Sequence, residues 1–102
     1  MDKPALKAVF ITYNQALTEK VEFMLDRMGI RGYTQWENVM GRGSVEGNPH
    51  MGTHTWPEIN SSVLTIIDAS KVSDLLDNVV RLDNVNKDVG IRAFVWDVTQ
   101  TV

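Results

Sequence analysis

His50 and His54, the chain's only two histidines, lie close together in a stretch that is rich in glycine and proline. Imidazole nitrogens bind zinc and copper, and a flexible backbone lets two rings turn toward one metal ion. Two ligands do not complete a site. Further ligands would come from the same loop of a neighbouring subunit, from the thioethers of Met40 and Met51 for copper(I), or from the carboxylates of Glu37, Glu46, Glu58 and Asp97. The alternative is that both histidines are exposed loop residues without a metal.

A second group with possible chemistry is the tripeptide Gly41-Arg42-Gly43 in the same stretch. Glycines let backbone N–H groups converge on a phosphate, but a short Gly-x-Gly also simply gives a strand its turn. Residues 40–57 hold four of the seven glycines and both histidines. A connection of this length without secondary structure of its own is uncommon in a compact domain unless it has a function. We therefore predict a long functional loop over about 40–57.

Composition excludes several classes of protein. The absence of cysteine rules out disulfides, thiolate zinc sites and a cysteine nucleophile. A net charge of -3 gives no general attraction to nucleic acid, so nucleic acid is not expected as a partner. The apolar run at 8–11 is too short for a signal peptide or a membrane span. We expect a cytoplasmic protein that is not embedded in a membrane.

No arrangement of residues selects a reaction. Ser61 and Ser62 lack the sequence context of a hydrolase nucleophile. Glu37 and Asp97 are candidates for paired carboxylates, but acid–base catalysis needs a defined separation that the sequence does not supply. We predict that the protein is not an enzyme.

Hydrophobic periodicity predicts the elements that must position these residues. Apolar and β-branched runs predict strands over 5–13, 30–39, 59–68 and 91–98. Helical spacing predicts one amphipathic helix from Leu17 to Met28, ended by Gly29, and a second from about Ser70 until Asn84, Asn86 and Asp88 interrupt it. The order is strand–helix–strand, long loop, strand–helix–strand.

This order predicts an α+β fold of the ferredoxin-like βαββαβ type. Two right-handed βαβ units close most simply into a four-stranded antiparallel sheet with both helices on one face, and the long loop joins the second and third strands. The halves also share a weak internal repeat, GIRGY at 29–33 and GIRAF at 90–94. Because the first and last strands are apolar on both faces, we expect the uncovered face to be buried between subunits.

With these elements in place, the chain resembles the PII-like superfamily of signal-transduction and metal-tolerance proteins. The matching segments are GIRGYT at 29–34, VMGRGS at 39–44 and GIRAFV at 90–95, and the element order matches over nearly the whole chain. The resemblance implies a single domain over 1–102 and a homotrimer with clefts between subunits. In better-known members these clefts bind adenine nucleotides, and the loop docks onto a transporter or an enzyme.

The chain also departs from the family pattern. Residues 83–90 supply one glycine where nucleotide-binding members have a second glycine-rich segment, and the loop carries His50 and His54 instead of a modifiable tyrosine. Variant members encoded near heavy-metal efflux systems look more similar.

We therefore expect a non-enzymatic regulator whose loop responds to a divalent or copper ion at His50 and His54, or to a small metabolite, and acts on a partner such as a membrane transporter. The alternative is an adenine-nucleotide sensor, with Gly41, Arg42, Gly43 and Arg92 in the cleft between subunits.

Overall fold

The computed structural model describes residues 5–42, 49–50 and 59–102. The strands and helices are, in chain order, β1 (Leu6–Asn14), the 3-10 turn η1 (Gln15–Leu17), α1 (Thr18–Arg27), β2 (Tyr33–Val39), β3 (Gly41–Arg42), β4 (Pro49–His50), β5 (Asn60–Asp68), the 3-10 turn η2 (Ala69–Lys71), α2 (Val72–Val85) and β6 (Ile91–Asp97). The four long strands and two helices match the predicted elements, with shifts of a few residues at their ends.

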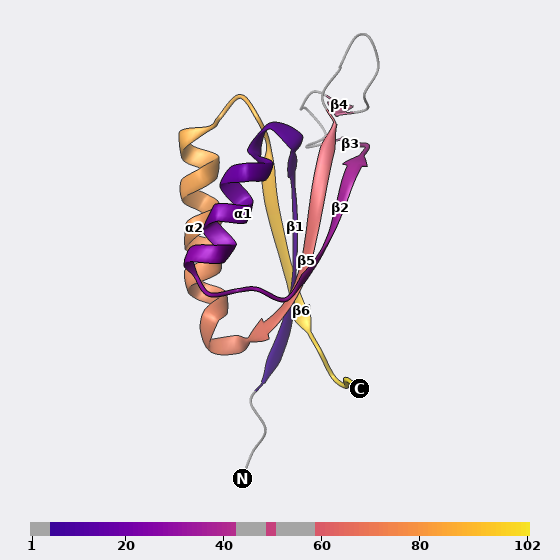
Figure 1. The fold of residues 1–102 in the computed structure, drawn as a ribbon, viewed down its shortest axis with the longest axis vertical. Coiled ribbons are helices and arrows are strands. Elements are labelled where there is room, and N and C mark those ends of the chain that lie inside the picture. The colour runs from indigo at the N-terminus through magenta and orange to yellow at the C-terminus, as the bar shows by residue number, and fades with distance from the viewer. Residues whose placement is uncertain (1–4, 43–48, 51–58) are drawn as a thin grey trace.

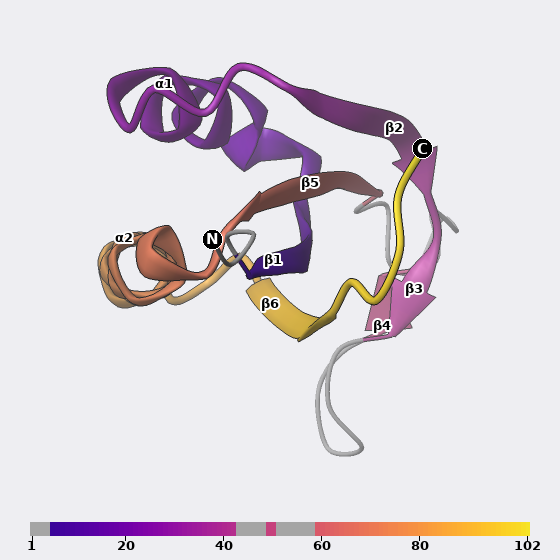
Figure 2. The same ribbon diagram turned by 90° about the horizontal axis from the view of Figure 1, so that it is seen from below.

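The four long strands form one antiparallel sheet in the order β2-β5-β1-β6. Both helices lie on the same face of this sheet (Figures 1 and 2). This is the predicted ferredoxin-like arrangement, in which the two central strands come from different halves of the chain. Strands β2 and β6 are the two edges, and β2 leads directly into the short strand β3.

The core lies between the sheet and the helices. Alternate residues of β1 face the helices, and Val9, Ile11 and Tyr13 are at most 1% exposed. The helices contribute Val21, Leu25 and Leu75 to the same cluster, each fully buried. The 3.6-residue period of the helices and the two-residue period of the strands thus place one apolar stripe against another.

The two halves of the chain have nearly the same local structure where a strand enters a helix. Asn14 ends β1 with φ -61° and ψ 138°, and its side chain accepts a hydrogen bond from the Ala16 N–H. Asp68 ends β5 with φ -63° and ψ 140°, and accepts from the Ser70 N–H in the same way. In each half, a short polar side chain thus accepts a hydrogen bond from a backbone N–H in the first residues of the 3-10 turn, which would otherwise lack a partner within the turn. The internal repeat is therefore stronger in the structure than in the sequence.

Strand β2 ends in an irregularity that redirects the chain. Its register with β5 shifts between Trp36 and Val39, and Asn38 has φ 59°. Asparagine is one of the few residues other than glycine that tolerates this left-handed conformation. The shift turns β2 into β3, which pairs with β4 at the base of the predicted loop. The predicted long connection between the second and third strands of the sheet is present, and within it Gly41 and Arg42 pair with His50 and Pro49, a short ladder that the sequence did not indicate.

The buried core leads to a first prediction. Truncating the fully buried Leu75 to alanine leaves a cavity under both helices and lowers the free energy of unfolding by about 2 to 5 kcal/mol. Urea denaturation at fixed subunit concentration measures the change. Val85→Ala is the matched control, because Val85 is 78% exposed and its truncation should change stability by no more than about 0.5 kcal/mol. Equal effects of the two substitutions would contradict the assignment of the core.

Candidate functional site

The sheet face opposite the helices is apolar and uncovered. Four large side chains on it are between 44% and 50% exposed: Trp36, Ile66, Phe94 and Trp96. Phe10 lies among them and meets Trp36 edge to face, with ring centroids 6.4 Å apart. Monomeric proteins rarely expose an apolar surface of this kind. The structure thus confirms that the predicted bare face is apolar.

This face becomes polar at the end of the sheet where β2 runs into β3. The register places Trp36, Ser62, Thr12 and Arg92 in one row across the four strands. The Ser62 hydroxyl donates to the Thr12 hydroxyl at 3.2 Å. The guanidinium of Arg92 lies over the ring of Phe94, 5.8 Å from its centroid. Two hydroxyls and an arginine therefore lie at the loop end of an otherwise apolar surface. Such a surface can bind a ligand that has an anionic group, which would contact the arginine, beside an apolar group.

The predicted nucleotide-binding residues lie at this end of the sheet but at opposite edges. Gly41 and Arg42 form β3 beyond the β2 edge, whereas Arg92 is on β6, the other edge. Gly43 lies outside the described residues. Three gaps between neighbouring strands separate the two edges, and at roughly 4.8 Å for each gap this is about 14 Å. The two arginines therefore come from different strands, Arg92 from an edge of the main sheet and Arg42 from the separate β3–β4 ladder.

The predicted metal ligands are only partly placed. The β3–β4 ladder puts His50 opposite Gly41, while His54 lies outside the described residues. Within residues 5–42, 49–50 and 59–102, no three side chains of histidine, cysteine, aspartate or glutamate form a group that could hold a metal ion. A site built from His50 and His54 stays a prediction.

The other proposed carboxylates are separated or lie outside the described residues. Asp97 forms an ion pair with Lys7 at the start of β1, whereas Glu37 is exposed on β2 near the opposite end and opposite edge of the sheet. Within one subunit these two do not form the acid–base pair considered from the sequence. Glu46 and Glu58 lie outside the described residues, as does the possible thioether ligand Met51.

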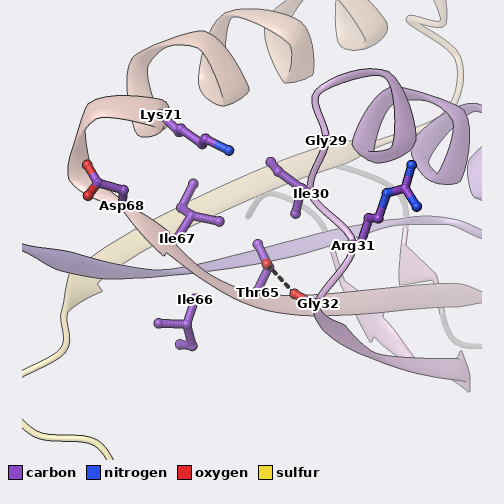
Figure 3. A pocket seen from close by; sticks show the side chains of 9 residues that line it. All are labelled: Gly29, Ile30, Arg31, Gly32, Thr65, Ile66, Ile67, Asp68 and Lys71. Atoms are coloured by element: carbon purple, nitrogen blue, oxygen red, sulfur yellow. Dashed lines mark hydrogen bonds between the residues drawn. The ribbon is translucent and has the colours of Figure 1, made fainter. Parts of the chain in front are cut away.

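A pocket that the sequence did not indicate opens on the helix side of the sheet, where the α1–β2 connection passes the end of β5. We call it the Lys71 pocket (Figure 3). It has a volume of about 260 Å³ and is lined by Gly29, Ile30, Arg31, Gly32, Thr65, Ile66, Ile67, Asp68 and Lys71. The Thr65 hydroxyl donates to the Gly32 carbonyl at 2.7 Å and holds the connection against β5. The pocket forms between segments that are distant in the chain, residues 29–32 and 65–71, so no local sequence pattern predicts it.

Two titratable groups near these elements have shifted pKa values. Burial raises the pKa of Tyr13, whose phenol oxygen accepts a hydrogen bond from the Gln35 side chain at 3.1 Å. The hydrogen bond from the Ser70 N–H lowers the pKa of Asp68 below its ordinary value of 3.8. Tyr13 is thereby kept neutral and structural, and Asp68 is kept ionised as a cap.

Comparison with known proteins agrees with this geometry. The family model "Nitrogen regulatory protein P-II" matches residues 6–102, nearly the whole chain. The chain belongs to the P-II family. The predicted resemblance is therefore confirmed, and the sheet with two helices on one face is the P-II domain of this protein. No curated protein matches the sequence.

Several solved P-II-like structures share the fold. CPII from Thiomonas intermedia K12, bound to ADP, AMP and bicarbonate, has a TM-score of 0.70 and 23% identity, over 92% of this chain and 86% of CPII. The apo form of CPII has a TM-score of 0.65 and 20% identity, over 95% of both chains. A PII-like signalling protein from Thermus thermophilus has a TM-score of 0.64 and 22% identity, over 96% of this chain and 91% of that one.

The Asp68 cap yields a second prediction. The pKa of Asp68 in the folded protein lies below its ordinary value of 3.8. The ionised side chain therefore contributes its full stabilisation above pH 3.8, and this stabilisation is lost as the pH falls from 3.8 through the folded pKa. Asp68→Asn should fold, because asparagine at position 14 caps the other half, and should lose less stability than the wild type over this acid range. Denaturation midpoints from pH 7 down to acid pH measure this. The exposed Asp83→Asn serves as control, and identical acid profiles for wild type and Asp68→Asn would contradict the role of the cap.

Proposed function

We propose that this P-II family protein is a non-enzymatic regulator that binds an adenine nucleotide between the subunits of a homotrimer. One observation supports this most directly. Arg42, on β3 after the edge strand β2, and Arg92, on the other edge strand β6, lie at the same end of the sheet, so the β2 edge of one subunit placed beside the β6 edge of another would bring the two arginines to one cleft.

The uncovered face supplies the reason for assembly. Burying the exposed parts of Trp36, Phe94 and Trp96 against copies of the same surface removes a large aromatic area from water. P-II-like proteins are typically trimers that regulate partner proteins. A closed ring of three subunits brings each β2 edge beside a neighbour's β6 edge and forms three equivalent clefts.

The ligand class follows from the residues at the cleft. Arg42 and Arg92 would bind phosphates, and Gly41 and Gly43 would let the backbone approach them closely. The apolar surface beside Arg92, with Phe94 under its guanidinium, suits a flat base. CPII, which shares the fold, binds ADP, AMP and bicarbonate. Because residues 83–90 hold a single glycine, we expect a diphosphate or monophosphate to be held mainly by side chains here.

The loop from about 40 to 57 is the proposed contact with a regulated partner, for which a membrane transporter is one candidate. It leaves the sheet through β3 and returns through β4, directly beside the proposed cleft. Ligand in the cleft would therefore change the surface that the loop presents. Neither described helix is long and apolar enough to cross a bilayer.

A third prediction tests the cleft. Arg42→Ala and Arg92→Ala should each weaken ADP binding about tenfold or more, because each removes a charge-assisted hydrogen bond to phosphate. Isothermal titration with ADP, AMP and ATP measures the affinity. Arg81→Ala is the matched control, since Arg81 is an exposed arginine of α2 away from the cleft. Unchanged affinity in both cleft variants would contradict the assignment.

The proposed assembly leads to a further prediction, which combines a measurement of subunit count with the ADP titration. Phe94→Glu places a charge on the uncovered face, where the side chain is half-exposed, so the subunit should still fold but remain a monomer. Light scattering after size exclusion gives the subunit count, and circular dichroism confirms folding. A folded monomer that binds ADP as tightly as the wild type would show that the site does not need two subunits.

A metal response is a second candidate function, favoured by the position of His50 on β4. The ladder with Gly41 places this histidine at the base of the loop, next to the proposed nucleotide site. We propose that His50 and His54, with a carboxylate or a neighbouring subunit, bind a divalent or copper ion there. Metal and nucleotide would then act on the same loop.

A fourth prediction separates the two ligands. Zinc and copper should bind the wild type, and the double substitution His50→Ala, His54→Ala should weaken metal binding about tenfold or more, because it removes both imidazole ligands. Its affinity for ADP in metal-free buffer should stay within twofold of the wild-type value. Titration calorimetry with each metal, and separately with ADP, measures both. Equal metal affinity in the wild type and the double variant would rule out these histidines as ligands.

A further inference from the structure

The outward surface of α1 carries an exposed aromatic ring. Phe23 is 62% exposed, whereas Val21, Met24 and Leu25 of the same helix are buried in the core. The guanidinium of Arg27 lies over the Phe23 ring, 5.7 Å from its centroid. Both helices cover the sheet face opposite to the uncovered apolar one (Figure 2). Burying the uncovered face between subunits would therefore leave this surface of α1 in water.

The charged residues of α1 have no opposite charges to pair with inside the helix. Residues three or four positions apart are neighbours on a helix surface. The charged pairs at these spacings in α1 are Glu19 with Glu22 and Glu22 with Asp26, and both are pairs of like charge. In the part of the chain that the structure describes, the single salt bridge is Lys7–Asp97, which does not involve α1. The charges on this surface are thus available to another molecule.

The helix dipole explains only part of this charge pattern. An acid near the start of a helix and a base near its end are favourable, as Glu19 and Arg27 are here. Lys20 and Asp26 lie in the first and last turns in the reverse, unfavourable order. Lys20 donates a hydrogen bond to the neutral side chain of Asn86 at 2.9 Å. The dipole therefore does not account for the order of the four charges.

The order becomes regular when it is counted outward from Phe23. Positions 19 and 27 carry a negative and a positive charge, positions 20 and 26 carry a positive and a negative charge, and all four side chains are exposed. In an antiparallel pair of α1 helices with a two-fold axis at Phe23, positions at equal distances before and after residue 23 face each other. Glu19 then faces Arg27 of the second copy, and Lys20 faces its Asp26. Every facing pair has opposite charges.

The spacing of these residues also suits helix packing. Glu19, Phe23 and Arg27 are four positions apart and form one ridge along α1. Ridges of this kind pack against each other with the helix axes about 50° apart, the commonest class of helix contact. The two Phe23 rings then meet at the two-fold axis, with a Glu19–Arg27 pair on each side. A parallel arrangement would instead bring like charges together.

We propose that α1 is a self-association surface, on which the antiparallel α1 of a second copy of this chain docks. The helix has ten residues and spans about 15 Å. The contact is thus smaller than the roughly 1,200 Å² or more of stable interfaces, and it is weak. It joins assembled proteins at high concentration and leaves the Phe94→Glu subunit monomeric at the dilution of size exclusion. It lies on the opposite side of the sheet from the surface proposed for assembly of the trimer.

Removing the central ring is the first test. Phe23→Ala changes an exposed position, so the variant should fold normally and should weaken self-association about tenfold or more. Sedimentation velocity over a series of protein concentrations measures the association. Val85→Ala, at an exposed apolar position of α2, is the matched control and should associate as the wild type does. Equal association of Phe23→Ala and wild type, or a wild type of one size at all concentrations, would overturn the proposal.

Charge reversal tests the two-fold arrangement. Glu19→Arg and Arg27→Glu each place like charges opposite one another at two symmetric contacts, so each variant alone should lose about tenfold or more in self-association. A mixture of the two variants should associate as the wild type does, because each supplies the charge that the other lacks. Arg81→Glu, an exposed reversal on α2, is the control and should have no effect. Circular dichroism checks that each variant is folded. A mixture that associates no more strongly than its components would overturn the antiparallel pairing.

Discussion

The constraint on which the structure depends is that two helices cover only one face of a four-stranded sheet. Packing of α1 and α2 against β1 and β5 forms the core. The same geometry leaves aromatic side chains of β2 and β6 in water on the other face. A sheet exposed in this way is stable in solution chiefly when another surface covers it. The assembly, the cleft between subunits and the loop regulation that we propose all rest on this asymmetry.

The sequence predicted the fold well because the fold rests on local periodicity. The apolar spacing of Leu17, Val21 and Leu25 is that of one helix face, and all three are buried in the core. The β-branched run at 59–68 forms β5, and the position of Gly29 at a φ of 72° was foreseen as the end of a helix. Each of these features is decided within a few residues, so a single sequence contains the information.

The candidate site was harder to predict because its parts are distant in the chain. Arg42 and Arg92 were chosen by residue type, but their positions, on β3 after one edge strand and on β6 at the other edge, depend on strand order, which no local pattern encodes. The β3–β4 ladder was missed because two-residue strands leave no periodic signal. The Lys71 pocket was missed because its lining comes from segments distant in the chain, residues 29–32 and residues 65–71.

The strand order has one more consequence, for how the two halves of this chain depend on each other. β1 and β2 belong to the first half but are not neighbours, since β5 lies between them, and β1 in turn lies between β5 and β6 of the second half. Each half alone would therefore hold two strands with an empty slot where the other half's strand belongs. A chain cleaved within 43–48 would give fragments that complete one sheet together and that cannot do so separately. Pairing of β5 with both β1 and β2 thus holds the two halves together independently of the covalent connection between β2 and β5.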